Sequence, residues 1–238
     1  MTASPVMFWR ARSPEDSARV GALLHLLPLA RLSRRRLGEL FGARAARAYG
    51  VGISVSYALM ILLLPSTTEA STFAALVKNA LSSASWAVAG FVSLSAARDL
   101  SQRDRVDGVS ALAESRGYGN HALEWSRFGA AAFVIAVWLF LPLAALSLLA
   151  GLRLAGPSTA WTLAWLGFLA LYVPLLALTL SALARVAARF YPSYGRSALA
   201  TFVLLPHLVR WAFPEVPSVP AAFAWLLERG TDFVSLVA

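Results

Sequence analysis

The chain has 238 residues, a mean hydropathy of +0.65 and only 14% charged residues. A soluble domain carries about 25% charged residues, so this composition excludes an ordinary soluble domain and indicates a polytopic membrane protein. The formal net charge is +9, and all but one of the 21 basic residues are Arg. In a membrane protein such charge is typical of a topology signal and of contact with anionic membrane lipids, so we expect no nucleic-acid partner.

Few residues in the sequence are suited to catalysis. Cysteine is absent, and His25, His121 and His207 lie far apart, so neither a disulfide framework nor a metal site is indicated. The only Lys is Lys78, so the phosphate-binding loop GxxxxGK[ST] cannot occur, and neither GxSxG nor HExxH is present. We therefore expect no catalytic residue, no cofactor and no metal ligand in this chain.

Residues 1–47 are predicted to form a basic cytoplasmic segment with an amphipathic helix. The apolar stretch 21–30 is short and is followed by Arg instead of a cleavage site, so it is not a cleaved signal. A basic amphipathic helix is typical of a segment that lies in the lipid headgroup plane; a helix packed on a partner is the alternative. The expected membrane-interface residues are Arg34, Arg35, Arg36, Leu37, Leu40, Phe41, Arg44 and Arg47.

Residues 48–238 are predicted to form an all-α transmembrane domain, a polytopic helix bundle with five or six transmembrane helices. A helix needs about 20 apolar residues to cross the hydrocarbon core. The tail 219–238 is ambiguous, because Glu228, Arg229 and Asp232 interrupt it; a short outer-surface or re-entrant helix is favoured over a sixth span. Apolar runs predict the other spans at about 48–68, 71–97, 129–150, 158–184 and 197–213.

The basic residues predict how the chain is oriented. With the N-terminus in the cytoplasm, the inside segments 1–47, 98–127 and 185–196 hold 17 of the 21 Lys and Arg residues. The outside segments hold only Arg153 and Arg229. This distribution follows the positive-inside rule, and we expect the protein in the cytoplasmic (inner) membrane of a bacterium.

A polar segment, SQRDRVDGVSALAESRGYGNHALEWSRF (101–128), separates spans two and three and is longer than a turn needs. Val109 and Leu112 have helical spacing and predict a helix over 104–116. RGYGN (116–120) can end this helix, because Gly tolerates a positive φ. A solvated loop of mixed charge is the alternative, but it explains neither the helical spacing nor the glycine break.

The layout from the amphipathic helix through span three resembles the permease subunits of ABC transporters, in the exporter class that moves drugs, lipids or polysaccharides. The resemblance is carried by DGVSALAESRG (107–117), by Leu123 and by SRF (126–128). It covers most of the chain in layout but only this stretch in motif. The C-terminus departs from the family, whose members usually have a clear sixth span that returns inside.

The resemblance implies a transport subunit that is not itself an enzyme and that pairs with a separate ATPase, which would hold ATP and Mg²⁺. In that family the segment between spans two and three is the coupling helix, which docks on the ATPase, and a second permease subunit completes a homo- or heterodimer. Neither the substrate nor the direction of transport follows from the sequence. The residues implied to contact the ATPase are Asp104, Arg105, Asp107, Val109, Leu112, Glu114 and Arg116.

Two other functions stay open. A membrane scaffold that anchors a cytoplasmic partner through 1–47 and 101–127 would use the same polar segments. DRVDGVSA (104–111) also resembles the opening D-x2-D-G-x2-A of the membrane CDP-alcohol phosphotransferases, which continues with Arg, Gly and two more Asp that bind divalent metal and the CDP pyrophosphate. Here Leu112 stands at the Arg position and no further Asp follows until Asp232, so this alternative is the weaker one.

Overall fold

The computed structural model describes residues 14–65, 68–154 and 158–237. Within these ranges the chain forms helices and no strands, which confirms the predicted all-α class. Among the described residues, four helices are long and apolar enough to cross a membrane. The residues outside these ranges are 1–13 of the predicted N-terminal segment, 66–67 of predicted span one, 155–157 between predicted spans three and four, and 238 of the tail.

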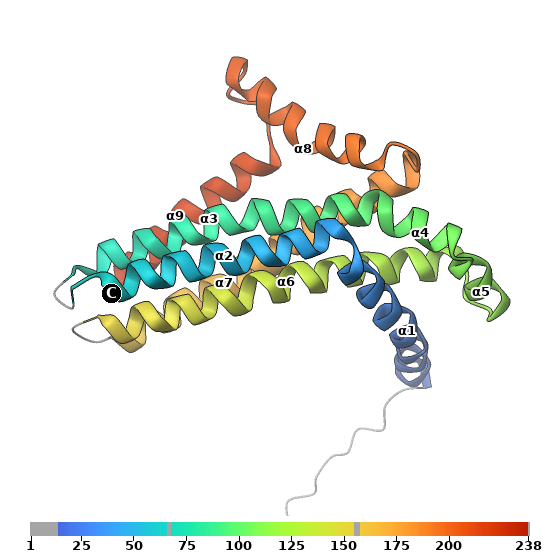
Figure 1. The fold of residues 1–238 in the computed structure, drawn as a ribbon, viewed down its shortest axis with the longest axis horizontal. Coiled ribbons are helices and arrows are strands. Elements are labelled where there is room, and N and C mark those ends of the chain that lie inside the picture. Colours follow the sequence, from blue (N-terminus) through green and yellow to red (C-terminus); the bar gives the residue numbers. More distant parts are fainter. Residues whose placement is uncertain (1–13, 66–67, 155–157, 238) are drawn as a thin grey trace, which may run out of the picture.

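Long helices that lie side by side form the body of the molecule (Figure 1). They correspond to predicted spans one to four, but the first begins at Phe41 instead of residue 48. The reason is that small residues, Ala43, Ala46 and Gly50, continue the face that packs on the bundle. The four helices are α2 (Phe41–Leu63), α3 (Ala70–Leu94), α6 (Asn120–Arg153) and α7 (Ser158–Phe190).

The second membrane-length helix continues past the end of α3. Ser95–Leu100 form a π-helical turn, η1, and Ser101–Val106 form α4, so helix runs without interruption over Ala70–Val106. A π turn inside a helix often marks a functional site. The helix of predicted span two, 71–97, therefore continues into the polar segment. The first charged residues of the polar segment lie on this continuation, at the end of the bundle.

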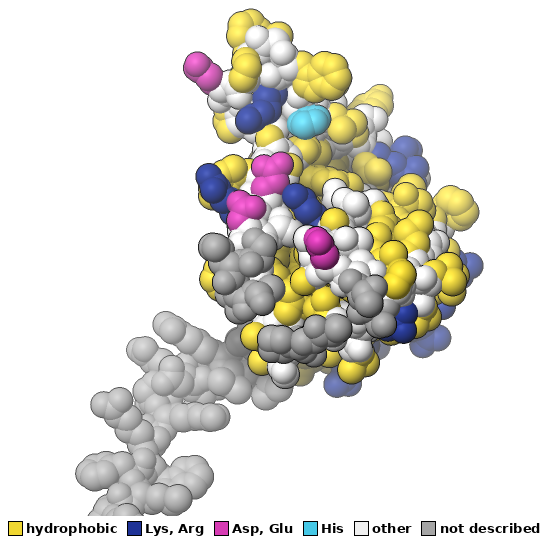
Figure 2. Space-filling view, turned by 90° about the vertical axis from the view of Figure 1, so that its left-hand side faces the viewer, with side chains coloured by type: hydrophobic (Ala, Val, Ile, Leu, Met, Phe, Trp, Pro, Cys, Tyr) yellow, Lys and Arg dark blue, Asp and Glu magenta, His cyan; other side chains and the backbone are white. Residues whose placement is uncertain are grey.

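We call this end of the bundle the arginine-rich end and define it by Arg36, Arg103, Arg127, Arg185 and Arg189. The α2–α3 and α6–α7 connections lie at the opposite end (Figure 1). Figure 2, viewed onto that opposite end, shows hydrophobic side chains around the rim, and exposed large hydrophobic residues lie along α2, α6 and α7. Apolar flanks between polar ends suit a helix bundle that is surrounded by lipid.

The N-terminal helix α1 (Pro14–Glu39) packs against α6. Ser33 is buried, with its Oγ 2.9 Å from Oγ of Ser126 on α6. Leu37, expected at the lipid interface, is instead fully buried in the protein core. Leu40 has an extended backbone and separates α1 from α2. Of the other residues expected at the interface, Arg36 and Leu40 are partly buried, and Arg34, Arg35, Phe41, Arg44 and Arg47 are exposed.

After α7 the chain forms two shorter helices, α8 (Gly195–Ala212) and α9 (Val219–Val237). α8 leaves the bundle and α9 returns to its flank (Figure 1), where Phe223 and Leu227 join the core. Predicted span five, 197–213, therefore forms a helix, but α8 and α9 are not among the helices with the length and apolarity of a span. In the described residues four helices qualify as spans by length and apolarity, and the predicted count of five or six is not confirmed.

Candidate functional site

The polar segment folds into two short helices at the arginine-rich end. α4 ends at Val106, and α5 covers Val109–Ser115. Gly108 precedes α5 with a φ of 68°, and Gly117 follows it with a φ of 79°, a left-handed conformation that glycine adopts readily. The predicted helix over 104–116 is therefore interrupted at Gly108, whereas the predicted glycine stop is confirmed.

α5 has one face on the bundle and one face in solvent. Ala113 is buried against Leu29 of α1 and Leu123 of α6, while Leu112 on the other face is 51% exposed. An incoming partner can therefore reach the outer face of α5. Of the residues implied to contact an ATPase, Arg105, Asp107, Leu112, Glu114 and Arg116 are exposed, Val109 is partly buried and Asp104 is buried.

Asp104 is the centre of an ion-pair cluster that joins three helices. Its side chain is 1% exposed. Arg36 of α1 donates from Nε to Oδ1 at 2.7 Å, and Arg127 of α6 donates from Nε to Oδ2 at 2.8 Å. Charge-assisted hydrogen bonds of this kind are about twice as strong as neutral ones. Because both carboxylate oxygens are engaged inside the chain, Asp104 fastens α4 to α1 and α6 and is not placed to contact a partner.

Further ion pairs extend the cluster toward solvent. Arg36 also donates to Asp107, and Arg103 pairs with Glu39 at 2.9 Å. Burial alone would lower the pKa of the Arg36 guanidinium, but its hydrogen bonds to Asp107 and Asp104 and the charges of both carboxylates raise that pKa above its ordinary value. The carboxylates of Asp104 and Asp107 therefore hold Arg36 in its charged form.

Asp104 and Asp107 are the two carboxylates shared with the opening motif of the CDP-alcohol phosphotransferases. Arg36 donates to both of them, and Arg127 takes the second oxygen of Asp104. In the described part of the chain no three His, Asp or Glu side chains come together as metal ligands. The donor set therefore does not fit the metal pair that this resemblance implies, since guanidinium groups already neutralise the carboxylates.

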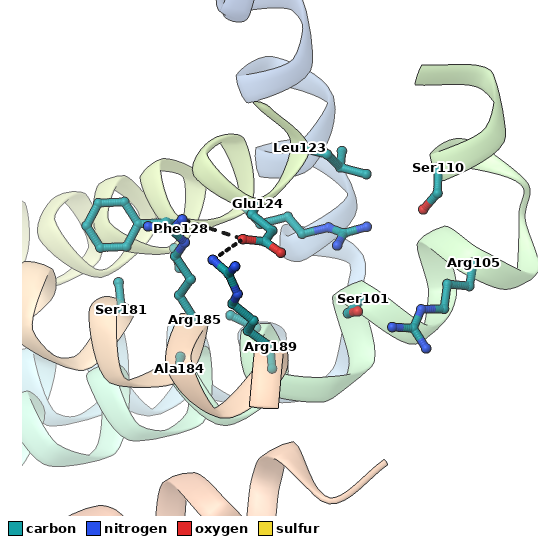
Figure 3. Close-up of a pocket in the computed structure, with 14 residues that line it drawn as sticks. Ser101, Arg105, Ser110, Leu123, Glu124, Phe128, Ser181, Ala184, Arg185 and Arg189 are labelled. Carbon is teal, nitrogen blue, oxygen red and sulfur yellow. Dashed lines mark hydrogen bonds and ion pairs between the residues drawn. The ribbon is translucent and has the colours of Figure 1, made fainter. Parts of the chain in front are cut away.

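A cavity of about 380 Å³ lies beside this cluster, between η1, α4, α5, α6 and α7 (Figure 3). Glu124 is shared by two guanidinium groups, 3.5 Å from Nη2 of Arg185 and 3.8 Å from Nη1 of Arg189. The guanidinium carbon of Arg185 lies 3.8 Å from the centre of the Trp125 ring, a cation–π arrangement. The charged residues that line the cavity are Arg105, Arg127, Arg185, Arg189 and Glu124.

Sequence reasoning did not identify Arg127, Arg185, Arg189 and Glu124 as site residues. Arg127 entered only as part of the SRF motif, and Arg185 and Arg189 only as topology charges, because the positive-inside rule counts basic residues and does not say which way each one points. One signal was present in the spacing: Arg185 and Arg189 are four residues apart, which puts them on one face of a helix.

No family model, curated protein or solved structure matches this chain.

Proposed function

We propose that this chain is the transmembrane subunit of an ABC-type exporter, with its arginine-rich end in the cytoplasm and α5 as the helix that docks on a separate ATPase. The observation that carries the proposal is the position of α5. It stands at the end of the bundle with Leu112 half-exposed and Glu114 and Arg116 in solvent. An apolar side chain flanked by opposite charges suits a protein partner.

α5 is connected mechanically to the helices of the bundle. Ala113 seats α5 against α1 and α6, and Asp104 fastens the preceding helix α4 to the same two helices. A force on α5 would therefore be passed to helices that lead into spans one, two and three. ATP and Mg²⁺ would be held by the ATPase, and a second permease subunit would complete the pathway for a substrate.

The scaffold alternative receives less support from the structure. It uses the N-terminal segment as an anchor for a partner, but Ser33 and Leu37 of α1 are buried against the bundle. α5 remains a surface that a scaffold could use. The two functions differ in their partner: the exporter requires a bound partner that hydrolyses ATP, whereas the scaffold does not.

Charge reversal on α5 tests the proposed docking. An exposed ion pair contributes about 0.2–1 kcal/mol, so the double variant Glu114→Lys with Arg116→Glu should weaken association with the ATPase by roughly two- to thirtyfold. The measurement is ATP hydrolysis that copurifies with the affinity-tagged chain from its native membrane. Glu69→Lys, an exposed change near the opposite end, is the matched control and should leave this activity unchanged. Equal ATPase yield from all three proteins would contradict the docking proposal.

Single cysteines test the proposed orientation, since the natural chain contains none. Ser115→Cys and Ser193→Cys, at the arginine-rich end, should react with a membrane-impermeant thiol reagent only from the cytoplasmic side. Glu69→Cys and Asp232→Cys should react only from outside, because α9 ends near the start of α3. All four side chains are exposed. Outside labelling at position 115 would place the molecule the other way round.

A further inference from the structure

The cavity at the arginine-rich end has an excess of positive charge that the protein does not neutralise. Four arginines and one carboxylate, Glu124, line it. Glu124 is divided between Arg185 and Arg189 at 3.5 and 3.8 Å, distances longer than a good charge-assisted hydrogen bond. Arg127 is already paired with Asp104, whose carboxylate is engaged through both of its oxygens, so three arginines remain in the lining against the single carboxylate of Glu124. The cavity is therefore suited to an anion.

Buried donors in the cavity wall point to the same conclusion. Among the described residues, Nη2 of Arg127, Nε of Arg185 and Oγ of Ser181 are buried without a hydrogen-bond partner. Ser181 itself is 1% exposed. Buried polar groups are nearly always paired in native proteins, and guanidinium N–H groups can only donate. A ligand that supplies acceptor oxygens at the cavity wall would give these donors partners once their side chains turn toward it.

Figure 3 shows that the side chains converge from different helices. Arg185 and Arg189 extend from α7 toward Glu124 on α6, while Arg105 and Ser110 stand on α4 and α5 across the cavity. Arg185 is also held against Trp125, so one of its faces is already fixed. Several planar guanidinium groups around one space match the oxygen geometry of a phosphate group.

We propose that this cavity binds a phosphate group, carried either by an anionic lipid head group or by a soluble phosphate compound. The volume of about 380 Å³ exceeds the needs of a small halide ion, whereas a phosphate can contact arginines on α6 and α7 at once. The position at the end of the spans is the depth at which lipid phosphates lie. This inference does not depend on the docking of an ATPase, because it concerns a site inside the bundle.

The full chain in nanodiscs of neutral phosphatidylcholine provides the first arm of the test. Titration with inorganic phosphate and pyrophosphate, followed by calorimetry, asks whether a soluble phosphate binds. In the second arm, native mass spectrometry in detergent compares retention of phosphatidylglycerol with retention of phosphatidylcholine. Binding in the first arm identifies a soluble ligand, and selective retention in the second identifies a lipid. Absence of both overturns the proposal.

Variants distinguish the cavity from general attraction to a basic protein. Arg185→Gln and Arg189→Gln should each lower phosphate or phosphatidylglycerol affinity about tenfold, because each removes a guanidinium that faces the ligand. Arg229→Gln is the matched control: it removes the same charge at the opposite end, where the side chain is 67% exposed. If Arg229→Gln weakens binding as much as the cavity variants do, the effect is one of net charge and the proposal fails.

Ser181→Ala separates a binding role from a structural one. It removes a buried hydroxyl that has no partner among the described residues, so the empty protein should unfold at the same temperature or higher. Phosphate affinity should still fall about threefold, because one donor to the ligand is lost. If Ser181→Ala binds phosphate as the natural chain does, Ser181 is not part of the site. If Arg105→Gln, on the exposed wall of the cavity, also binds normally, the cavity assignment is overturned.

Discussion

Replacing Asp104 with Asn should lower the free energy of unfolding by about 3–5 kcal/mol, the cost of removing one partner from a buried ion pair. Asp104 is 1% exposed and holds Arg36 and Arg127, so the change leaves Arg127 without a countercharge and Arg36 with Asp107 alone. One kcal/mol shifts the unfolding midpoint by roughly 2–4 °C in a chain of this size. The midpoint in detergent should therefore fall by about 6–20 °C.

Asp107→Asn is the matched control for this change. Asp107 also pairs with Arg36, but its side chain is 41% exposed, so water compensates the loss and the cost should stay below about 1 kcal/mol. The double variant Asp104→Asn with Arg127→Gln should recover part of the lost stability, because it removes the guanidinium that Asp104→Asn leaves unpaired. If the two single Asn variants unfold at the same temperature, Asp104 does not hold the three helices together.

The membrane-length helices could be predicted because they depend on a property of the linear sequence. Long apolar runs need no knowledge of neighbours, and four of them match helices of sufficient length. For residues 197–213 and 219–238, apolar runs alone did not predict how the chain is arranged. Gly195–Ala212 and Val219–Val237 form helices, but charged residues and prolines shorten the apolar stretch, and the path of each helix depends on packing against α3 and α7.

The N-terminal region shows why a periodic pattern can mislead. Leu37, Leu40 and Phe41 were grouped as one apolar face, which assumes that a single helix contains them. The structure breaks the helix at Leu40, so Leu37 belongs to α1 and is buried, whereas Phe41 opens α2 and is 86% exposed. The sequence has no capping side chain that would predict this break, since Leu40 makes no side-chain cap hydrogen bond.

The ion-pair cluster could not be predicted, because the π turn changes the phase of the helix before it. A π turn adds one residue, and each residue rotates the helix by about 100°. The apolar spacing of α3 therefore does not say which way Asp104 points after Ser95–Leu100. The sequence singled out Asp104 and Asp107 for their chemistry, but their arginine partners on α1 and α6 are distant in the chain.

The same π turn explains why Gly195 should tolerate no side chain. A Cβ at Gly195, the first residue of α8, would fall on the carbonyl oxygen of Ala97 in η1, well inside van der Waals contact. Backbone atoms on both helices cannot rotate away, so α8 would have to shift, and the neighbouring ion pair between Arg196 and Asp99 would shift with it.

Gly195→Ala should therefore cost about 1–3 kcal/mol, as other overpacked substitutions do, and should lower the unfolding midpoint by about 2–12 °C. Gly167→Ala is the matched control, because a Cβ there meets nothing within 4 Å. In the middle of α7 this change should instead stabilise the chain by about 0.5–1 kcal/mol, since Gly is the poorer helix residue. The two Gly→Ala variants should thus move the midpoint in opposite directions. A shift of the same sign in both would mean that α8 does not rest on the π turn, because only a close backbone contact makes the two glycines different.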